Sequence, residues 1–114
     1  VIYLEHKGSS IRALLESMAT TNFQVLGGIR VVSENGKLVS VEVAGEPLDD
    51  DKVYGMVTNS FLLHGGDGLF LAKDAIAVVD LGVLVCDVML DYVKAETAAG
   101  RQIVGSVDGR VVIR

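Results

Sequence analysis

The pair Asn35-Gly36 constrains the fold of this chain more than any other feature of its sequence. It separates two runs rich in β-branched residues, Gly28 to Ser33 and Leu38 to Val43. Asparagine and glycine both tolerate the positive φ angles of a two-residue turn between antiparallel strands. We therefore predict a β-hairpin over residues 28–43.

A strand over residues 1–7 and a helix after it are predicted ahead of the hairpin. Serine side chains accept hydrogen bonds from the first turn of a helix, so we expect Ser9 or Ser10 to cap it. Four apolar residues then recur at helical spacing and would share a face toward the core. They are Ile11, Leu14, Leu15 and Met18.

The rest of the chain alternates in the same way. Strands are predicted over residues 52–58, 75–79 and 105–113, and a second helix over Val83 to Ala95 that Gly100 ends. This pattern predicts an α+β fold: a single domain with a mixed or antiparallel sheet, with hairpins packed by two main helices.

Composition excludes several classes of function. The chain has 114 residues, half of them hydrophobic, and a net charge of −5. The acidic balance disfavours nucleic acid as a partner, and no apolar run approaches the ~20 residues of a membrane span. The single cysteine, Cys86, lies in an apolar stretch and is expected to be a buried, slowly reacting thiol.

No catalytic or metal-binding residue is predicted. Two histidines are too few for a two-metal site, and the run from Asp49 to Asp51 is typical of a solvated turn. His64 adjoins two glycines and is expected to be exposed. Ser60 with His64 lacks the context of a nucleophile elbow.

The densest motif runs from Asn59 to Gly68 and places three glycines around Asp67. Such a segment turns sharply or approaches a ligand closely. It lacks the lysine and hydroxyl of a P-loop and the alternating carboxylates of a calcium loop. A structural turn and a ligand contact both remain open.

Two phenylalanines lie near loops rather than on apolar stripes. Phe23 is in a polar segment flanked by glycines, and Phe70 follows the glycine-rich motif. An aromatic ring on a loop either fills the core or stacks on a flat ligand, where each base stack contributes roughly 1–3 kcal/mol. The sequence leaves both interpretations open.

Taken together, four motifs resemble the C-terminal domain of the 5′-nucleotidase family, which comprises two-domain secreted or periplasmic phosphohydrolases. The resemblance extends over nearly all of the chain, through Asp91-Tyr92-Val93 and the closing Asp108-Gly109-Arg110-Val111. The motifs are Phe23 to Ile29 (FQVLGGI), Val43 to Asp49 (VAGEPLD), Val57 to Leu62 (VTNSFL), and Gly65 to Gly68 (GGDG).

The resemblance implies a division of labour. An N-terminal metallophosphoesterase domain, absent from this chain, would hold two divalent metal ions and hydrolyse the substrate. The C-terminal domain would supply a nucleoside pocket. A nucleoside or nucleotide is then the expected ligand, and the metallophosphoesterase domain, in cis or as a separate chain, the expected partner.

Site residues follow from the same resemblance. Two aromatic side chains sandwich the base in that family: Phe23 takes the first position, and Leu69 falls at the second, where it offers no π face. Phe70 could replace it only by a shift of one residue, because neighbouring side chains on a strand point oppositely. Asp74 is the implied acidic ligand. The residues expected to shape the loop are Asn59, Gly65, Gly66, Asp67 and Gly68.

Besides Leu69 at the second aromatic position, the chain is expected to differ from the family in a second way, because the opening segment of the family's domain is missing. Residues 1–114 are therefore expected to be a partial C-terminal domain, and the chain alone is expected to be inactive. The favoured hypothesis is nucleoside recognition in a hydrolase of nucleotide catabolism, periplasmic or extracellular as the resemblance implies. The alternative is a stand-alone binding or scaffold module that keeps the fold without catalysis.

Overall fold

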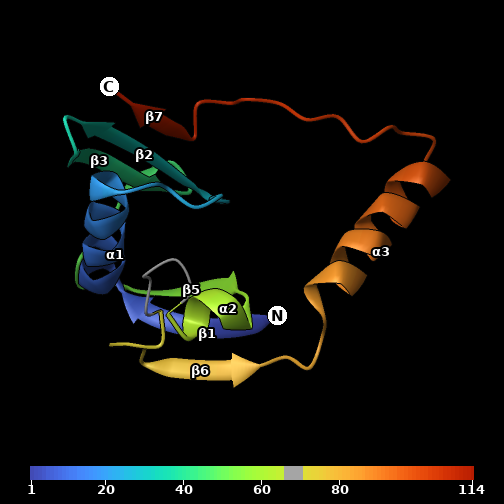
Figure 1. Ribbon diagram of the computed structural model, residues 1–114, viewed down its shortest axis with the longest axis horizontal. Helices are drawn as coiled ribbons and strands as arrows, with labels where there is room; N and C mark the ends of the chain where they lie inside the picture. Colours follow the sequence, from blue (N-terminus) through green and yellow to red (C-terminus); the bar gives the residue numbers. More distant parts are fainter. Residues whose placement is uncertain (66–70) are drawn as a thin grey trace.

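The computed structural model describes residues 1–65 and 71–114. This part of the chain forms two small sheets and three helices (Figure 1). The strand orders are β5-β1-β6 in one sheet and β4-β3-β2-β7 in the other. The elements are β1 (Ile2–Lys7), α1 (Gly8–Thr20), β2 (Ile29–Glu34), β3 (Lys37–Val43), β4 (Glu46–Pro47), β5 (Val53–Thr58), α2 (Ser60–Leu63), β6 (Ala77–Asp80), α3 (Val85–Ala98) and β7 (Val111–Ile113).

The predicted hairpin is confirmed as β2 and β3. Asn35 and Gly36 form its turn with φ angles of 51° and 75°, the left-handed values that this residue pair tolerates. The strands pair from Ile29 with Val43 onward, with a register shift between Val32 and Ser33. The α+β class is confirmed as well, and parallel pairing of β7 with β2 makes the larger sheet mixed.

The smaller sheet is built around β1. Strands β5 and β6 flank it and are both antiparallel to it. Side chains alternate along β1, so that Ile2, Leu4 and His6 are buried and their neighbours are less so. Ile2 and Leu4 join Leu63 and Leu71 in a small apolar cluster.

Helix α1 covers the larger sheet. Its predicted apolar face is confirmed, since Ile11, Leu15 and Met18 are buried against Val31 and Val41. Leu14, on the same side of the helix, is partly buried and packs against the cluster of the smaller sheet. One helix therefore links the two clusters.

The expected serine cap of α1 is wrong. The helix begins at Gly8, directly after β1, and no side chain caps it. The first free amides find backbone partners instead: Gly8 N–H donates to the carbonyl of Lys52 at 2.8 Å, and Ser9 N–H to that of Asp50 at 3.1 Å. A neighbouring segment thus satisfies the donors that the serines were expected to satisfy.

The second long helix departs further from expectation. Helix α3 lies apart from both sheets (Figure 1), and none of its residues is buried. The radius of gyration, 15.3 Å, exceeds the roughly 13 Å of a compact chain of this length. Cys86 on this helix is exposed, so the buried thiol and the packing of a second helix are wrong. An apolar face predicts that a helix packs against a partner, but it does not predict where that partner lies.

Candidate functional site

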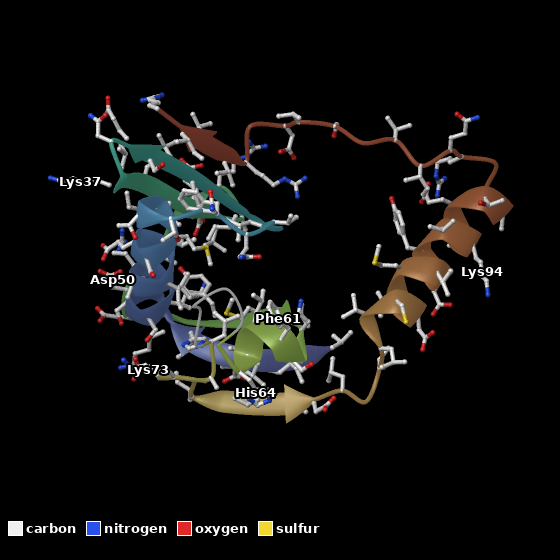
Figure 2. The ribbon with its side chains drawn as sticks, in the orientation of Figure 1. Lys37, Asp50, Phe61, His64, Lys73 and Lys94 are labelled. Carbon is white, nitrogen blue, oxygen red and sulfur yellow. The ribbon has the colours of Figure 1, made fainter. Side chains whose placement is uncertain are left out.

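The entrance to the glycine-rich motif is fixed by a helix cap. Asn59 is the N-cap of α2, and its Oδ1 accepts a hydrogen bond from Leu62 N–H at 2.9 Å. Helix α2 then leads into Gly65, whose φ of +99° disfavours any residue with a side chain. Asn59 and Gly65 therefore shape the base of the motif. Exposed Phe61 and His64 lie at this helix (Figure 2), and the exposure of His64 is as predicted.

The chain beyond the motif returns to α2. Leu71 N–H donates to the Leu62 carbonyl at 3.5 Å, and Ala72 N–H donates to the Leu63 carbonyl at 3.2 Å. These bonds join the residues that follow the motif to helix α2. Five predicted site residues lie outside the described residues: Gly66, Asp67, Gly68, Leu69 and Phe70.

Asp74 is carried by the turn that follows the motif, which we call the Asp74 turn (residues 71–76). The residue is exposed and has a φ of +63°, a left-handed conformation that aspartate tolerates better than most residues. Ala75 N–H donates to the Ala72 carbonyl at 3.3 Å, and Ile76 N–H donates to the Glu5 carbonyl of β1 at 2.8 Å. The turn is thus tied back to the smaller sheet with its carboxylate accessible to solvent.

His6 is a site feature that sequence reasoning missed. It is fully buried, and its Nε2 lies 2.7 Å from the carbonyl oxygen of Leu71, the first residue of the Asp74 turn. The signal for its burial was available, because His6 is in phase with Ile2 and Leu4 on β1. The hydrogen-bond partner, 65 residues away, was not.

Phe23 lies in the loop between α1 and β2 and is partly buried. It packs against the cluster of α1 and the larger sheet, whereas Leu71 belongs to the cluster of the smaller sheet. Leu62 contacts both clusters. The packing agrees with the interpretation of Phe23 as a core residue, and Phe23 and Leu71, the first residue after the undescribed segment, pack in different apolar clusters.

A pocket of about 540 Å³ lies between these regions, within the range of roughly 300–1,000 Å³ that small-molecule sites occupy. The segment 24–29 lines one part of it and Leu71 another, and neither Phe23 nor Asp74 is among its described lining residues. Its walls are mainly apolar. They include Leu14, Met18, Leu26, Tyr54, Met56 and Leu62.

A second hollow, of about 340 Å³, lies at the larger sheet, and its lining includes the charged residues Arg30, Glu42, Asp108 and Arg110. Arg110 donates to both carboxylate oxygens of Asp108 at 2.9 and 2.8 Å, and to the Leu26 carbonyl at 2.8 Å. Arg30 donates to the Asp108 carbonyl at 3.0 Å. The hydrogen bonds from Arg110 lower the pKa of Asp108 to about 2. These groups satisfy one another and fasten the start of β7.

Residues 1–65 and 71–114 contain no group of three or more histidine, cysteine or acidic side chains that could hold a metal ion. Asp49, Asp50 and Asp51 are exposed, as predicted, and Asp50 pairs with Arg12 at 2.8 Å. No helix in this described part has the length and apolarity of a membrane-crossing segment.

Comparison with known proteins identifies the family. The family model described as the 5′-nucleotidase C-terminal domain matches residues 1–74. The chain belongs to this family. The matched residues include β1, the glycine-rich motif and Asp74, and the resemblance inferred from the motifs is confirmed. In this family the catalytic metal sites lie in the N-terminal domain.

Relatives and solved structures agree with the assignment. A 5′-nucleotidase of Rattus norvegicus is 30% identical over 92% of this chain and 21% of its own length. The silent protein UshA(0) of Salmonella typhimurium is 27% identical over 82% and 18%. The structure of a 5′-nucleotidase precursor from Thermus thermophilus superposes with a TM-score of 0.84 at 27% identity, over 98% of this chain and 24% of that one. The chain thus spans only about a fifth of the length of these curated relatives.

Proposed function

We propose that this chain is the nucleoside-recognition part of a metal-dependent, 5′-nucleotidase-like phosphohydrolase of nucleotide catabolism. The observation that carries the proposal is the family match over residues 1–74, which spans the glycine-rich motif and Asp74. Catalysis would belong to a metallophosphoesterase domain, in cis or on a separate chain. There, two divalent ions would activate a water for in-line attack on phosphorus. The setting proposed for the enzyme is the periplasm or the extracellular space.

In this proposal Asp74 accepts a hydrogen bond from the nucleoside. Its carboxylate is exposed at a turn whose backbone is tied to both α2 and β1. Phe23 would stack on the base, with Leu69 and Phe70 on the opposite side. An aliphatic side chain at Leu69 lowers the stacking energy, so we expect weak affinity in the isolated chain, on the order of millimolar.

The large pocket supports this arrangement. It is lined by residues 24–29, which directly follow Phe23, and by Leu71, which begins the Asp74 turn. Its apolar walls suit the faces of a nucleobase. A base entering from this side would lie between the two segments that carry the proposed contacts.

The proposal is tested by titrating the chain with adenosine and with uridine while recording backbone NMR shifts. We expect shifts around Asp74 and residues 23–28, weakened in Asp74→Asn and unchanged in Asp51→Asn, a matched control at another exposed aspartate. Leu69→Phe should tighten binding. Phe23→Leu keeps an apolar side chain in the core, at a cost of less than about 1.5 kcal/mol, but removes the π face. Loss of binding without loss of folding would assign Phe23 to the ligand.

The alternative function is a stand-alone binding or scaffold module. The packing of Phe23 against the core cluster favours it, because a ring that fills the core is not free to stack. If neither nucleoside shifts any resonance near Asp74 and Leu69→Phe gains nothing, nucleoside recognition is wrong and the scaffold function replaces it.

A further inference from the structure

We propose that His6 is a positioning residue that holds the Asp74 turn through its hydrogen bond to the Leu71 carbonyl. The inference deepens the proposed function and rests on it for the role of Asp74 toward a nucleoside. The hold on the turn itself rests only on the structure.

At the location of His6, the burial of a polar side chain is costly unless the side chain forms a hydrogen bond. It is fully buried at the end of an apolar row formed by Ile2 and Leu4 on the inner face of β1. A leucine or methionine there would continue the row, whereas an imidazole must be hydrogen-bonded to offset the loss of its hydration. Within the described residues, the side-chain nitrogen Nδ1 is buried and has no partner. Among the described residues, the hydrogen bond of Nε2 is therefore the one that offsets the burial of the imidazole.

The partner fixes the state of the ring. A carbonyl oxygen can only accept, so Nε2 carries the proton that it donates to Leu71 across 2.7 Å. Of the two neutral tautomers, only the one with the proton on Nε2 makes this hydrogen bond. Leu71 is itself only 3% exposed, so water is a poor substitute for the histidine as a donor to this carbonyl.

Adjacent residues of β1 hold the two ends of the Asp74 turn. The His6 side chain binds the carbonyl of Leu71, and the Glu5 carbonyl accepts from Ile76 N–H at 2.8 Å. Between these anchors Asp74 has a φ of +63°. This left-handed conformation is less favourable for aspartate than for glycine, so contacts on either side of Asp74 help to hold it. The hydrogen bond between the imidazole of His6 and the Leu71 carbonyl holds the first end of the turn.

The test compares two variants of equal side-chain length in the full chain. His6→Gln keeps an N–H donor near the position of Nε2, and His6→Met keeps the bulk without a donor. We expect the amides of Ala72 and Ala75 to exchange about tenfold faster in His6→Met and at nearly the parent rate in His6→Gln. Ser33→Ala, which alters a buried polar residue in the other sheet, should leave these two amides unchanged.

An adenosine titration of the same variants reads out the functional consequence. We expect His6→Met to weaken binding about tenfold and His6→Gln to restore it. Equal exchange in parent and His6→Met overturns the hold of His6 on the turn. Faster exchange with unchanged adenosine affinity confirms that hold but overturns its role in nucleoside binding. If the parent itself does not bind adenosine, the proposed function fails, and the exchange rates alone decide whether His6 holds the turn.

A third measurement covers the case in which His6→Met does not fold. The ¹⁵N shifts of the parent imidazole report which nitrogen is protonated. A proton on Nε2 supports the hydrogen bond to Leu71, and a neutral ring protonated on Nδ1 overturns it.

Discussion

At the scale of single residues, Gly8 shows how closely the start of α1 approaches the segment between β4 and β5. A Cβ built at this position would lie 1.9 Å from the carbonyl oxygen of Asp49, and backbone atoms cannot move aside cheaply. We expect Gly8→Ala to lower the free energy of unfolding by about 1–3 kcal/mol, measured by urea denaturation. Gly105→Ala is the control, because nothing lies within 4 Å of its added Cβ. Equal midpoints for the two variants would contradict the close contact.

Cys86 is the residue whose environment differs most from the sequence expectation. It is exposed near the beginning of α3, and an accessible thiol reacts as fast as its thiolate fraction allows. We expect a disulfide reagent to label the native chain at nearly the rate found in urea, with Cys86→Ser as the blank. Labelling that occurs only after denaturation would mean that α3 is covered in solution.

At the scale of elements, an ion pair between Asp108 and Arg110 orders the segment that leads into β7, and backbone hydrogen bonds attach β7 itself to β2. Hydrogen bonds from Arg110 lower the pKa of Asp108 to about 2, from an ordinary value of 3.8. A carboxyl group whose pKa is lower in the folded state stabilises that state above its ordinary pKa, and the stabilisation is lost as the pH falls through the folded value. The relevant window is therefore about pH 4 down to pH 2.

We accordingly expect β7 to detach from β2 before the β2–β3 hairpin opens as the pH is lowered from 4 to 2. Faster amide exchange at Val31, whose N–H donates to the Arg110 carbonyl at 2.7 Å, would report the detachment. Asp108→Asn cannot titrate and should show the faster exchange at neutral pH, without further change in acid. Identical profiles for parent and variant would exclude the ion pair as the cause.

At the scale of the whole molecule, the family assignment predicts where the hydrolysis of phosphate takes place. In its family the catalytic metal sites lie in the N-terminal domain. We expect no release of phosphate from AMP by the purified chain with Mg²⁺, Mn²⁺, Zn²⁺ or Co²⁺. Activity that copurifies with the chain and falls in Asp74→Asn, but not in Asp51→Asn, would show this expectation to be wrong.

Features that depend on neighbours along the chain could be predicted from the sequence. Asn35-Gly36 formed the predicted turn because both residues accept positive φ. The stripe from Ile11 to Met18 faced the core because helical spacing places these residues on one side. The motifs of residues 23–68 were sufficient to identify the family, because each motif is a short run of consecutive residues that can be read directly from the sequence.

Only the tertiary structure decided the features that depend on contacts between distant segments. The amides at the start of α1 found carbonyls near residue 50 in place of serine caps. Helix α3, although apolar enough to pack, found no covering partner among the described residues. The imidazole of His6 met a carbonyl 65 residues away. The local sequence indicates which groups need a hydrogen-bond or packing partner. The path of the whole chain determines which partners come within reach of those groups.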